Sequence, residues 1–202
     1  MERVAAGVRR AQYRGQWLGP ASDEAHAHAV TLAEALTEME SLGLAPVLDD
    51  GAVAGNGAMR LPQGGWITSA SARRAAESAV VEIVSFDPAT FTVRYRGERG
   101  REPTSDVAMH HAALEAGAGA SLHGHALADE TDARRLALPI SDRETPFGTR
   151  EDLEATQALL RRAPYPTHRA WIRRGHGFLV AAATMDDARA LVRRLANSRR
   201  EA

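Results

Sequence analysis

Residues 119–129, GASLHGHALAD, place His123 and His125 two positions apart in an otherwise apolar run. The run predicts a short strand over Ala120–Ala126, and alternate residues of a strand project from the same face of a sheet. Both imidazoles could therefore reach one metal ion. The same spacing also suits two histidines that are merely neighbours, so this stretch alone leaves both interpretations open.

A second pair, His26 and His28 in AHAHAV (25–30), has the same spacing in a different setting. Its segment is predicted to be a helix that begins after the N-cap residue Ser22 and stops at Gly43. Helical residues two apart point about 200° away from each other around the axis, so they cannot chelate one ion. We expect these two histidines to be solvated or partly packed.

Composition limits the possible chemistry. A chain of 202 residues with 44% hydrophobic and 25% charged residues is long enough and apolar enough for one globular domain. The net charge of −1 favours neither a nucleic-acid nor a membrane partner. A charged N-terminus and the lack of a long apolar run lead us to expect a cytoplasmic protein. Cysteine is absent, so a bound metal would need histidine and carboxylate ligands.

Patterns along the chain predict alternating helices and strands. We expect a weak helix within an N-terminal extension, residues 1–21, and a single α/β domain over residues 22–202, with a central sheet covered by helices. Further helices are predicted at Ser105–Ala116, from Thr149 to about Arg162, and after Thr184. Strands are predicted around Gly57–Arg60 and Trp66–Thr68, in a hairpin of VVEIVSF (80–86) and FTVRYRG (91–97), and in RAWIRR (169–174) and GFLVAAA (177–183).

Two further residues could complete a site around the HGH stretch. RRGHGFLV (173–180) places His176 between two glycines at the junction of two predicted strands. Three histidines would form a catalytic zinc site with an open fourth position. REPTSDVAMHH (101–111) places Asp106 at the start of a helix, where its carboxylate could act as a base or as a further ligand. The alternative is an acid favoured there only by the helix dipole.

Five short motifs follow one another along the chain: GNGAMR (55–60), ITSAS (67–71), PTSDVAMH (103–110), HGH (123–125) and GHG (175–177). This ordered set resembles the class II aldolase/adducin family. That family includes sugar-phosphate aldolases, a sugar-phosphate 4-epimerase and the non-catalytic adducin heads. FGTRE (147–151) also resembles the segment that opens the penultimate helix of the aldolases, and the resemblance extends over roughly residues 30–196.

The resemblance implies a role for each matching residue. It implies that His123, His125 and His176 bind Zn²⁺ or another divalent cation, and that Asp106 is the catalytic acid/base. It also implies a three-layer fold with a mostly antiparallel central sheet, and assembly into a homotetramer. The residues that would cradle a substrate phosphate are Gly55, Asn56, Ala70, Ser71, Thr104 and Ser105.

By the same resemblance we expect an aldolase-type lyase. It would cleave or form a carbon–carbon bond in a small ketose phosphate or related hydroxy-carbonyl compound through a metal-stabilised enediolate. Two alternatives remain, a sugar-phosphate 4-epimerase and a non-catalytic adducin-like domain. Asp106 favours the epimerase, because the aldolases usually carry glutamate there.

The sequence also departs from the family pattern. Ala58 and Ser71 stand where the family usually has serine and glycine in its phosphate loops. The segment between HGH and FGTRE, residues 126–146, is short and lacks the tyrosine that donates a proton in the aldolases. Asp129, Asp142 and Glu144 are the candidates in this segment to replace it.

Overall fold

The computed structural model describes residues 12–200, in which one eight-stranded sheet lies between two layers of helices. The strands follow the order β1-β5-β4-β3-β2-β6-β8-β7, and every neighbouring pair is antiparallel except β1 and β5. The strands are β1 Arg14–Trp17, β2 Gly55–Arg60, β3 Trp66–Ser69, β4 Val80–Asp87, β5 Thr92–Arg96, β6 Ala120–Gly124, β7 Ala170–Arg173 and β8 Gly177–Ala182.

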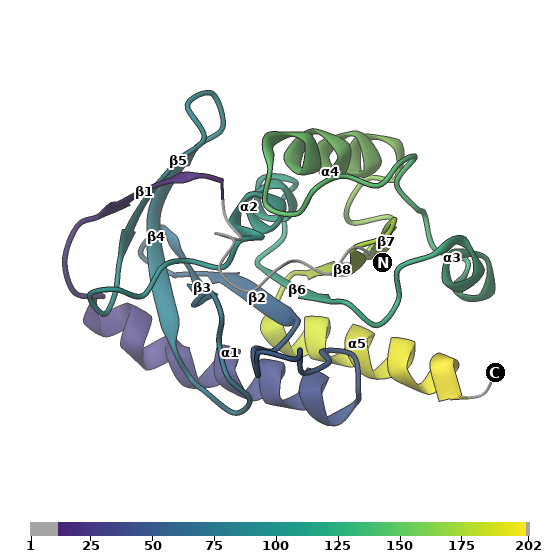
Figure 1. Cartoon of the computed structure of the whole chain (residues 1–202), viewed down its shortest axis with the longest axis horizontal. Helices are drawn as coiled ribbons and strands as arrows, with labels where there is room; N and C mark the ends of the chain where they lie inside the picture. Colours follow the sequence, from purple (N-terminus) through teal and green to yellow (C-terminus); the bar gives the residue numbers. More distant parts are fainter. Residues whose placement is uncertain (1–11, 201–202) are drawn as a thin grey trace.

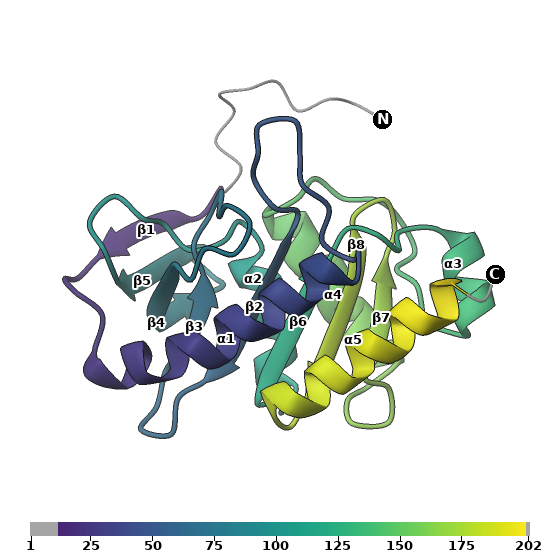
Figure 2. The same ribbon diagram turned by 90° about the horizontal axis from the view of Figure 1, so that it is seen from below.

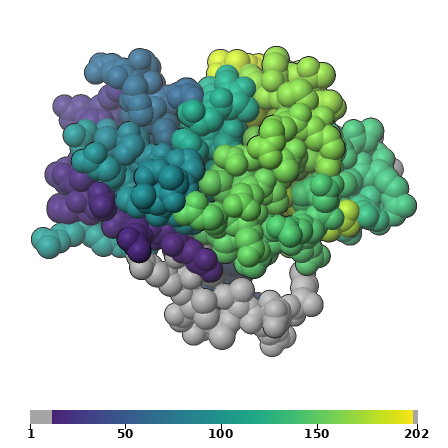
Figure 3. All heavy atoms as spheres, turned by 90° about the horizontal axis from the view of Figure 1, so that it is seen from above, coloured from purple at the N-terminus to yellow at the C-terminus, as the bar shows by residue number. Residues whose placement is uncertain are grey.

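The helices cover both faces of this sheet, as Figure 1 shows. α1 and α5 lie side by side across one face, which Figure 2 presents from below. α2 and α4 cover the other face. Figure 3 looks onto that side, where the green atoms of the later half of the chain lie beside the blue and teal atoms of the earlier half. The helices are α1 Asp23–Ser41, α2 Val107–Glu115, α3 Glu130–Leu136, α4 Arg150–Arg162 and α5 Met185–Arg200.

Two apolar cores separate the three layers, which confirms the predicted fold class. One core joins the sheet to α1 and α5 and includes Leu36, Leu122 and Val192, and the other joins it to α2 and α4 and includes Met109 and Leu153. Neighbouring residues of β6 face opposite cores, because strand side chains alternate. Burial of these apolar side chains supplies the main drive for folding.

Alternation along β6 places His123 on the α2/α4 side of the sheet. Leu122 belongs to the α1/α5 core, whereas Ser121 is hydrogen-bonded to His110 of α2 on the other side. Gly124 allows a close approach, because a Cβ there would collide with the Leu44 carbonyl oxygen. The strand ends at Gly124, so His125 follows it instead of lying within it.

The prediction for the N-terminal segment is wrong where it can be compared. Residues 1–11 lie outside the described residues, but Arg14–Trp17 form a strand instead of part of a weak helix. This strand pairs in parallel with β5, and the buried Tyr13 donates a hydrogen bond from its hydroxyl to the Pro103 carbonyl oxygen at 2.6 Å. Pairing at the sheet edge thus overrides a weak local preference for helix. The boundary at residue 22 stays a prediction.

Most other predicted elements are confirmed within a few residues. Ser22, Thr149 and Thr184 accept hydrogen bonds from backbone N–H groups at the starts of α1, α4 and α5. Helix α3 was not predicted, and its N-cap is Asp129, whose side chain accepts from the Asp132 N–H. Among the described residues no helix combines the length and apolarity needed to cross a membrane.

Candidate metal centre

Four side chains from separate elements converge at one end of the sheet. Asp106, His123, His125 and His176 each offer a ligand atom, and these four atoms lie within 4.8 Å of one another. The ring centroids of His123 and His176 are 4.5 Å apart, and that of His125 lies 4.9 and 5.1 Å from them. The structure therefore brings together the three histidines and the carboxylate that the sequence singled out.

The pairing of three strands produces this convergence. His123 lies opposite Asn56 of β2 and Leu179 of β8 in the ladder. His176 lies in the tight turn between β7 and β8. This turn packs closely against the end of β6. A Cβ at Gly177 would collide with the Gly124 carbonyl oxygen, so glycine is required for that approach. The turn thereby carries His176 to the end of β6.

The hydrogen bonds of the cluster leave ligand atoms without partners. His123 donates from Nδ1 to the Phe178 carbonyl oxygen at 2.6 Å, which leaves its Nε2 unprotonated. His123 Nε2, His176 Nε2 and Asp106 Oδ1 are buried and have no hydrogen-bond partner among residues 12–200. Buried polar atoms without partners are costly. A cation among them would bind the two nitrogens and would offset the charge of the Asp106 carboxylate. The donor set, imidazole nitrogen with carboxylate oxygen, fits a divalent ion such as Zn²⁺.

The charged groups of the cluster shift one another's pKa values. Burial alone would lower the pKa of His176, but the carboxylates of Asp106 and Asp152 outweigh it and raise that pKa to about 9. Burial also opposes ionisation of Asp106, yet the neighbouring histidines, His176 foremost, hold its pKa below its usual range. Burial and the nearby His176 charge hold the pKa of His123 well below 6.5. Of these three groups, His176 is therefore the one that carries a proton at neutral pH in the metal-free site.

We expect the His176 imidazole to titrate near pH 9 in the metal-free protein and not to titrate in that range once metal is bound. The metal must displace the His176 proton, so below pH 9 metal affinity should fall about tenfold for each unit of decreasing pH. NMR of the ring carbons and nitrogens, with His176→Gln to assign the signal, measures this. A midpoint near 6.5 would contradict the arrangement.

Asp106 is not an ordinary helix-start acid. It occupies the N-cap position of α2, but its side chain makes no cap hydrogen bond. Instead Asn56 Nδ2 donates to Asp106 Oδ2 at 2.6 Å, and Asp106 Oδ1 lies 3.4 Å from His176 Nε2. The carboxylate therefore faces the histidines, and the helix dipole does not explain its position.

A buried chain of hydrogen bonds holds Asp106 from behind, and sequence reasoning did not find it. His110 Nε2 lies 2.6 Å from Asn56 Oδ1, and His110 Nδ1 lies 2.7 Å from Ser121 Oγ. Burial lowers the pKa of His110 to about 4, so it is neutral, donates to Asn56 and accepts from Ser121. The spacing of Asp106 and His110, four residues apart at a helix start, was the available signal.

The residues expected to cradle phosphate lie in three stretches near the start of α2. Gly55 and Asn56 begin β2, where the Asn56 side chain is engaged by Asp106 and His110. The other two stretches, residues 70–71 and 104–105, are adjacent. Ala70 forms an isolated β-bridge with Pro103, and Ser71 N donates to the Glu102 carbonyl oxygen at 2.8 Å. Thr104 is buried, and Ser71 and Ser105 are partly exposed.

The three acids considered as replacements for tyrosine have different surroundings. Asp129 caps α3, and Asp142 is paired with Arg162. Glu144 packs against the backbone of Gly175, next to His176. Glu144 is therefore the acid of the three that contacts the histidine turn.

An aromatic ring lies against the outer side of the cluster. The Phe147 ring stacks on His176 with centroids 4.0 Å apart and an angle of 14° between the planes, and it meets His125 edge-on. Phe147 itself is 41% exposed. It belongs to FGTRE, the motif that the sequence placed at the start of the penultimate helix.

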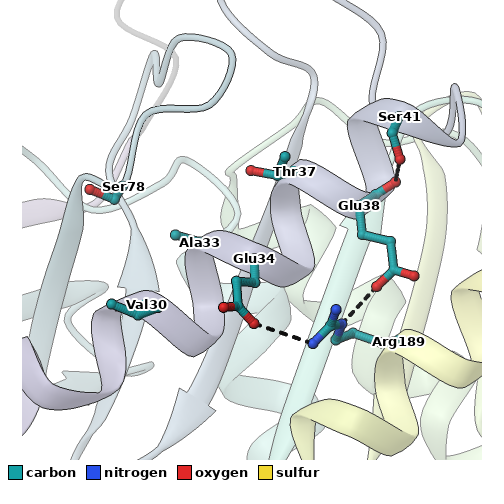
Figure 4. Close-up of a pocket in the computed structure, with 8 residues that line it drawn as sticks. All are labelled: Val30, Ala33, Glu34, Thr37, Glu38, Ser41, Ser78 and Arg189. Carbon is teal, nitrogen blue, oxygen red and sulfur yellow. Dashed lines mark hydrogen bonds and ion pairs between the residues drawn. The ribbon is translucent and has the colours of Figure 1, made fainter.

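His26 and His28, the second pair of histidines with the same spacing, lie elsewhere in the fold. His26 is exposed and His28 partly buried, both on α1, and neither belongs to the cluster. A surface depression over α1, shown in Figure 4, likewise lies in the helix layer on the other side of the sheet from His123. Arg189 closes one side of it through ion pairs with Glu34 and Glu38. It has no part in the metal cluster.

Comparison with known proteins points to one family. Residues 30–200 match the family described as Class II Aldolase and Adducin N-terminal domain. No curated protein sequence matches the chain.

Several solved structures share the fold at low identity. An L-fuculose 1-phosphate aldolase superposes with a TM-score of 0.64 at 18% identity, covering 90% of this chain and 85% of that one. The L-fuculose-1-phosphate aldolase of Thermus thermophilus gives 0.60 at 19%, covering 86% and 92%. A sugar-phosphate aldolase of Thermotoga maritima gives 0.64 at 15%, also covering 86% and 92%. These likenesses establish the fold.

Proposed function

The chain belongs to the class II aldolase and adducin N-terminal domain family, and from that premise we propose that it is a divalent-metal-dependent aldehyde-lyase. Its substrate would be a small ketose phosphate or a related hydroxy-carbonyl compound, in which it breaks or forms a carbon–carbon bond. The observation that carries this proposal is the cluster of Asp106, His123, His125 and His176, in which Asp106 Oδ1, His123 Nε2 and His176 Nε2 are buried without a hydrogen-bond partner among residues 12–200. The names of the similar structures, sugar-phosphate aldolases, support the substrate class.

Each residue of the cluster has a proposed task. His123, His125 and His176 hold the ion, which when bound supplies Lewis-acid stabilisation of negative charge on a substrate oxygen. Asp106 is fixed through Oδ2 by Asn56, so its Oδ1 is left to accept a proton from a substrate hydroxyl and to return it in the reverse direction.

The remaining groups bind and cover the substrate. Ser71, Thr104 and Ser105, together with backbone N–H groups at the start of α2, suit a phosphate. Phe147 covers the His176 ring, and Glu144 beside Gly175 is our candidate for the proton donor that replaces the missing tyrosine. Zinc as the metal, a cytoplasmic location and a homotetramer belong to the same proposal.

A sugar-phosphate 4-epimerase is the second candidate, favoured by aspartate rather than glutamate at position 106. The non-catalytic alternative is disfavoured, because a domain without chemistry gains nothing from burying unpartnered ligand atoms.

Metal content and product analysis test the proposal together. We expect about one divalent ion for each chain, and release of dihydroxyacetone phosphate plus an aldehyde from a ketose 1-phosphate. Chelation should abolish the reaction. Interconversion of two ketose 5-phosphates without fragments would select the epimerase instead, and a purified protein that neither contains nor takes up a divalent ion would refute both.

A further inference from the structure

A second buried carboxylate lies on the far side of His176. Asp152 Oδ1 lies 3.8 Å from His176 Nδ1, whereas Asp106 faces Nε2 of the same ring. Asp152 and His176 are each 2% exposed, so water does not screen them from one another. His176 therefore stands between two carboxylates, and Asp152 is not among the four groups that converge in the cluster.

Two residues hold the Asp152 carboxylate in place. Arg173 Nη2 donates to Asp152 Oδ1 at 2.5 Å, and the Thr145 hydroxyl donates to the same oxygen at 2.9 Å. Arg173 Nη2 also donates to the Thr145 oxygen at 3.0 Å, which closes the triangle. These three residues come from the end of β7, the first turn of α4 and the loop before it. Three elements are thus joined behind one histidine.

Neither stability nor helix capping accounts for this arrangement. A buried ion pair is commonly no more stabilising than a well-packed apolar pair of similar volume. An acid at the third position of a helix is favoured by the dipole, but Asp187 of α5 meets that need while exposed at the surface. Asp152 occupies the same position after Thr149 that Asp187 occupies after Thr184, with the same 3.1 Å bond from its N–H to the threonine hydroxyl. The burial of Asp152 and its pairing with Arg173 need another reason.

The other buried histidine of the cluster, His123, suggests the reason. His123 has its Nδ1 hydrogen held by the Phe178 carbonyl oxygen, so that Nε2 faces the cluster. Within the described part of the chain, His176 Nδ1 has no hydrogen-bond partner, neither a carbonyl oxygen nor any other group. Metal-binding histidines almost always donate their second ring N–H to a carboxylate or carbonyl, which orients the ring and makes the ligand nitrogen more basic.

We propose that Asp152, held by Arg173 and Thr145, is a positioning residue that keeps the His176 ring oriented with Nδ1–H toward its carboxylate and Nε2 toward the metal. This inference rests on the proposed metal-dependent function. Arg173 also offsets the Asp152 charge, so the site does not gain a second uncompensated carboxylate beside Asp106.

Affinity of the metal-free full-length chain for Zn²⁺, measured by competition with a chelator, tests the inference. We expect Asp152→Asn to weaken binding about 10–100-fold, and the matched variant Asp187→Asn to leave it unchanged. The absorption spectrum of bound Co²⁺, which reports ligand geometry, should change in Asp152→Asn and not in Asp187→Asn.

A second variant separates positioning from folding. In Asp152→Leu/Arg173→Leu the buried charges are removed together, so the chain should retain its melting temperature while Zn²⁺ binding weakens about as much as in Asp152→Asn. Wild-type affinity in a folded double variant would overturn the inference, as would failure of both variants to fold, which would make the pair structural. If the wild-type chain itself binds no divalent ion, the proposed function fails instead.

Discussion

Asp106→Asn is expected to lower the turnover rate by about 10²–10⁴ while the metal stays bound. Asparagine keeps the size of the side chain, and its amide oxygen can still accept the hydrogen bond from Asn56 Nδ2. It cannot accept and return a proton. The loss corresponds to about 3–5 kcal/mol of activation free energy. Turnover and metal content are to be measured on the same preparation, so that loss of chemistry is separated from loss of the ion.

Asp129→Asn is the matched control for this prediction. Asp129 is also an N-cap aspartate, but its side chain does cap its helix by accepting from the Asp132 N–H at 2.9 Å. Asparagine is as good an N-cap, so this variant should keep both stability and turnover. Full turnover in Asp106→Asn would make Asp106 structural and would move the proton-transfer role to Glu144.

His123→Gln is expected to weaken metal binding by more than about 100-fold and to reduce turnover to background. Removal of groups that merely support a ligand already costs about 10–100-fold, and loss of the ligand itself should cost more. His123 is fully buried between two strands, and glutamine fills a similar volume without placing a nitrogen at the same point. Metal content by mass spectrometry and the chelator competition described above measure the loss.

The double variant His26→Ala/His28→Ala is the control, with the same spacing of two histidines removed from α1. It should keep its full metal content and activity, because His26 is exposed and neither ring lies in the cluster. Loss of one metal equivalent in this double variant would show that α1 holds the ion, which would contradict our proposal.

Local sequence predicted the start of a helix correctly where a single N-cap residue determines it. Ser22, Thr149 and Thr184 each cap a helix at the predicted position, because a hydroxyl before an amphipathic run satisfies free N–H groups whatever the rest of the fold does. Local sequence did not predict the strand at the edge of the sheet. Arg14–Trp17 have little intrinsic preference for a strand, and they form β1 because β5 offers a free edge to pair with.

The candidate site divides in the same way. Strand and helix periodicity distinguished His123 and His125 from His26 and His28. The resemblance to the aldolase family then implied that His176 and Asp106 belong to the same site. Neither the periodicity nor the resemblance could show how Asp106 is held, because its partner Asn56 lies 50 residues away and reaches it through the pairing of β2 with β6.

By itself the sequence determined the α/β class and the starts of α1, α4 and α5, since these depend on local spacing and side-chain chemistry. Through its resemblance to one family it also indicated which residues could bind a metal. Tertiary structure alone decided the supports behind those residues. The Asn56–His110–Ser121 chain behind Asp106 and the Asp152–Arg173 pair behind His176 join positions 11 to 54 residues apart. Such bonds form only where packing excludes water, and burial of this kind depends on the whole fold and not on any local pattern.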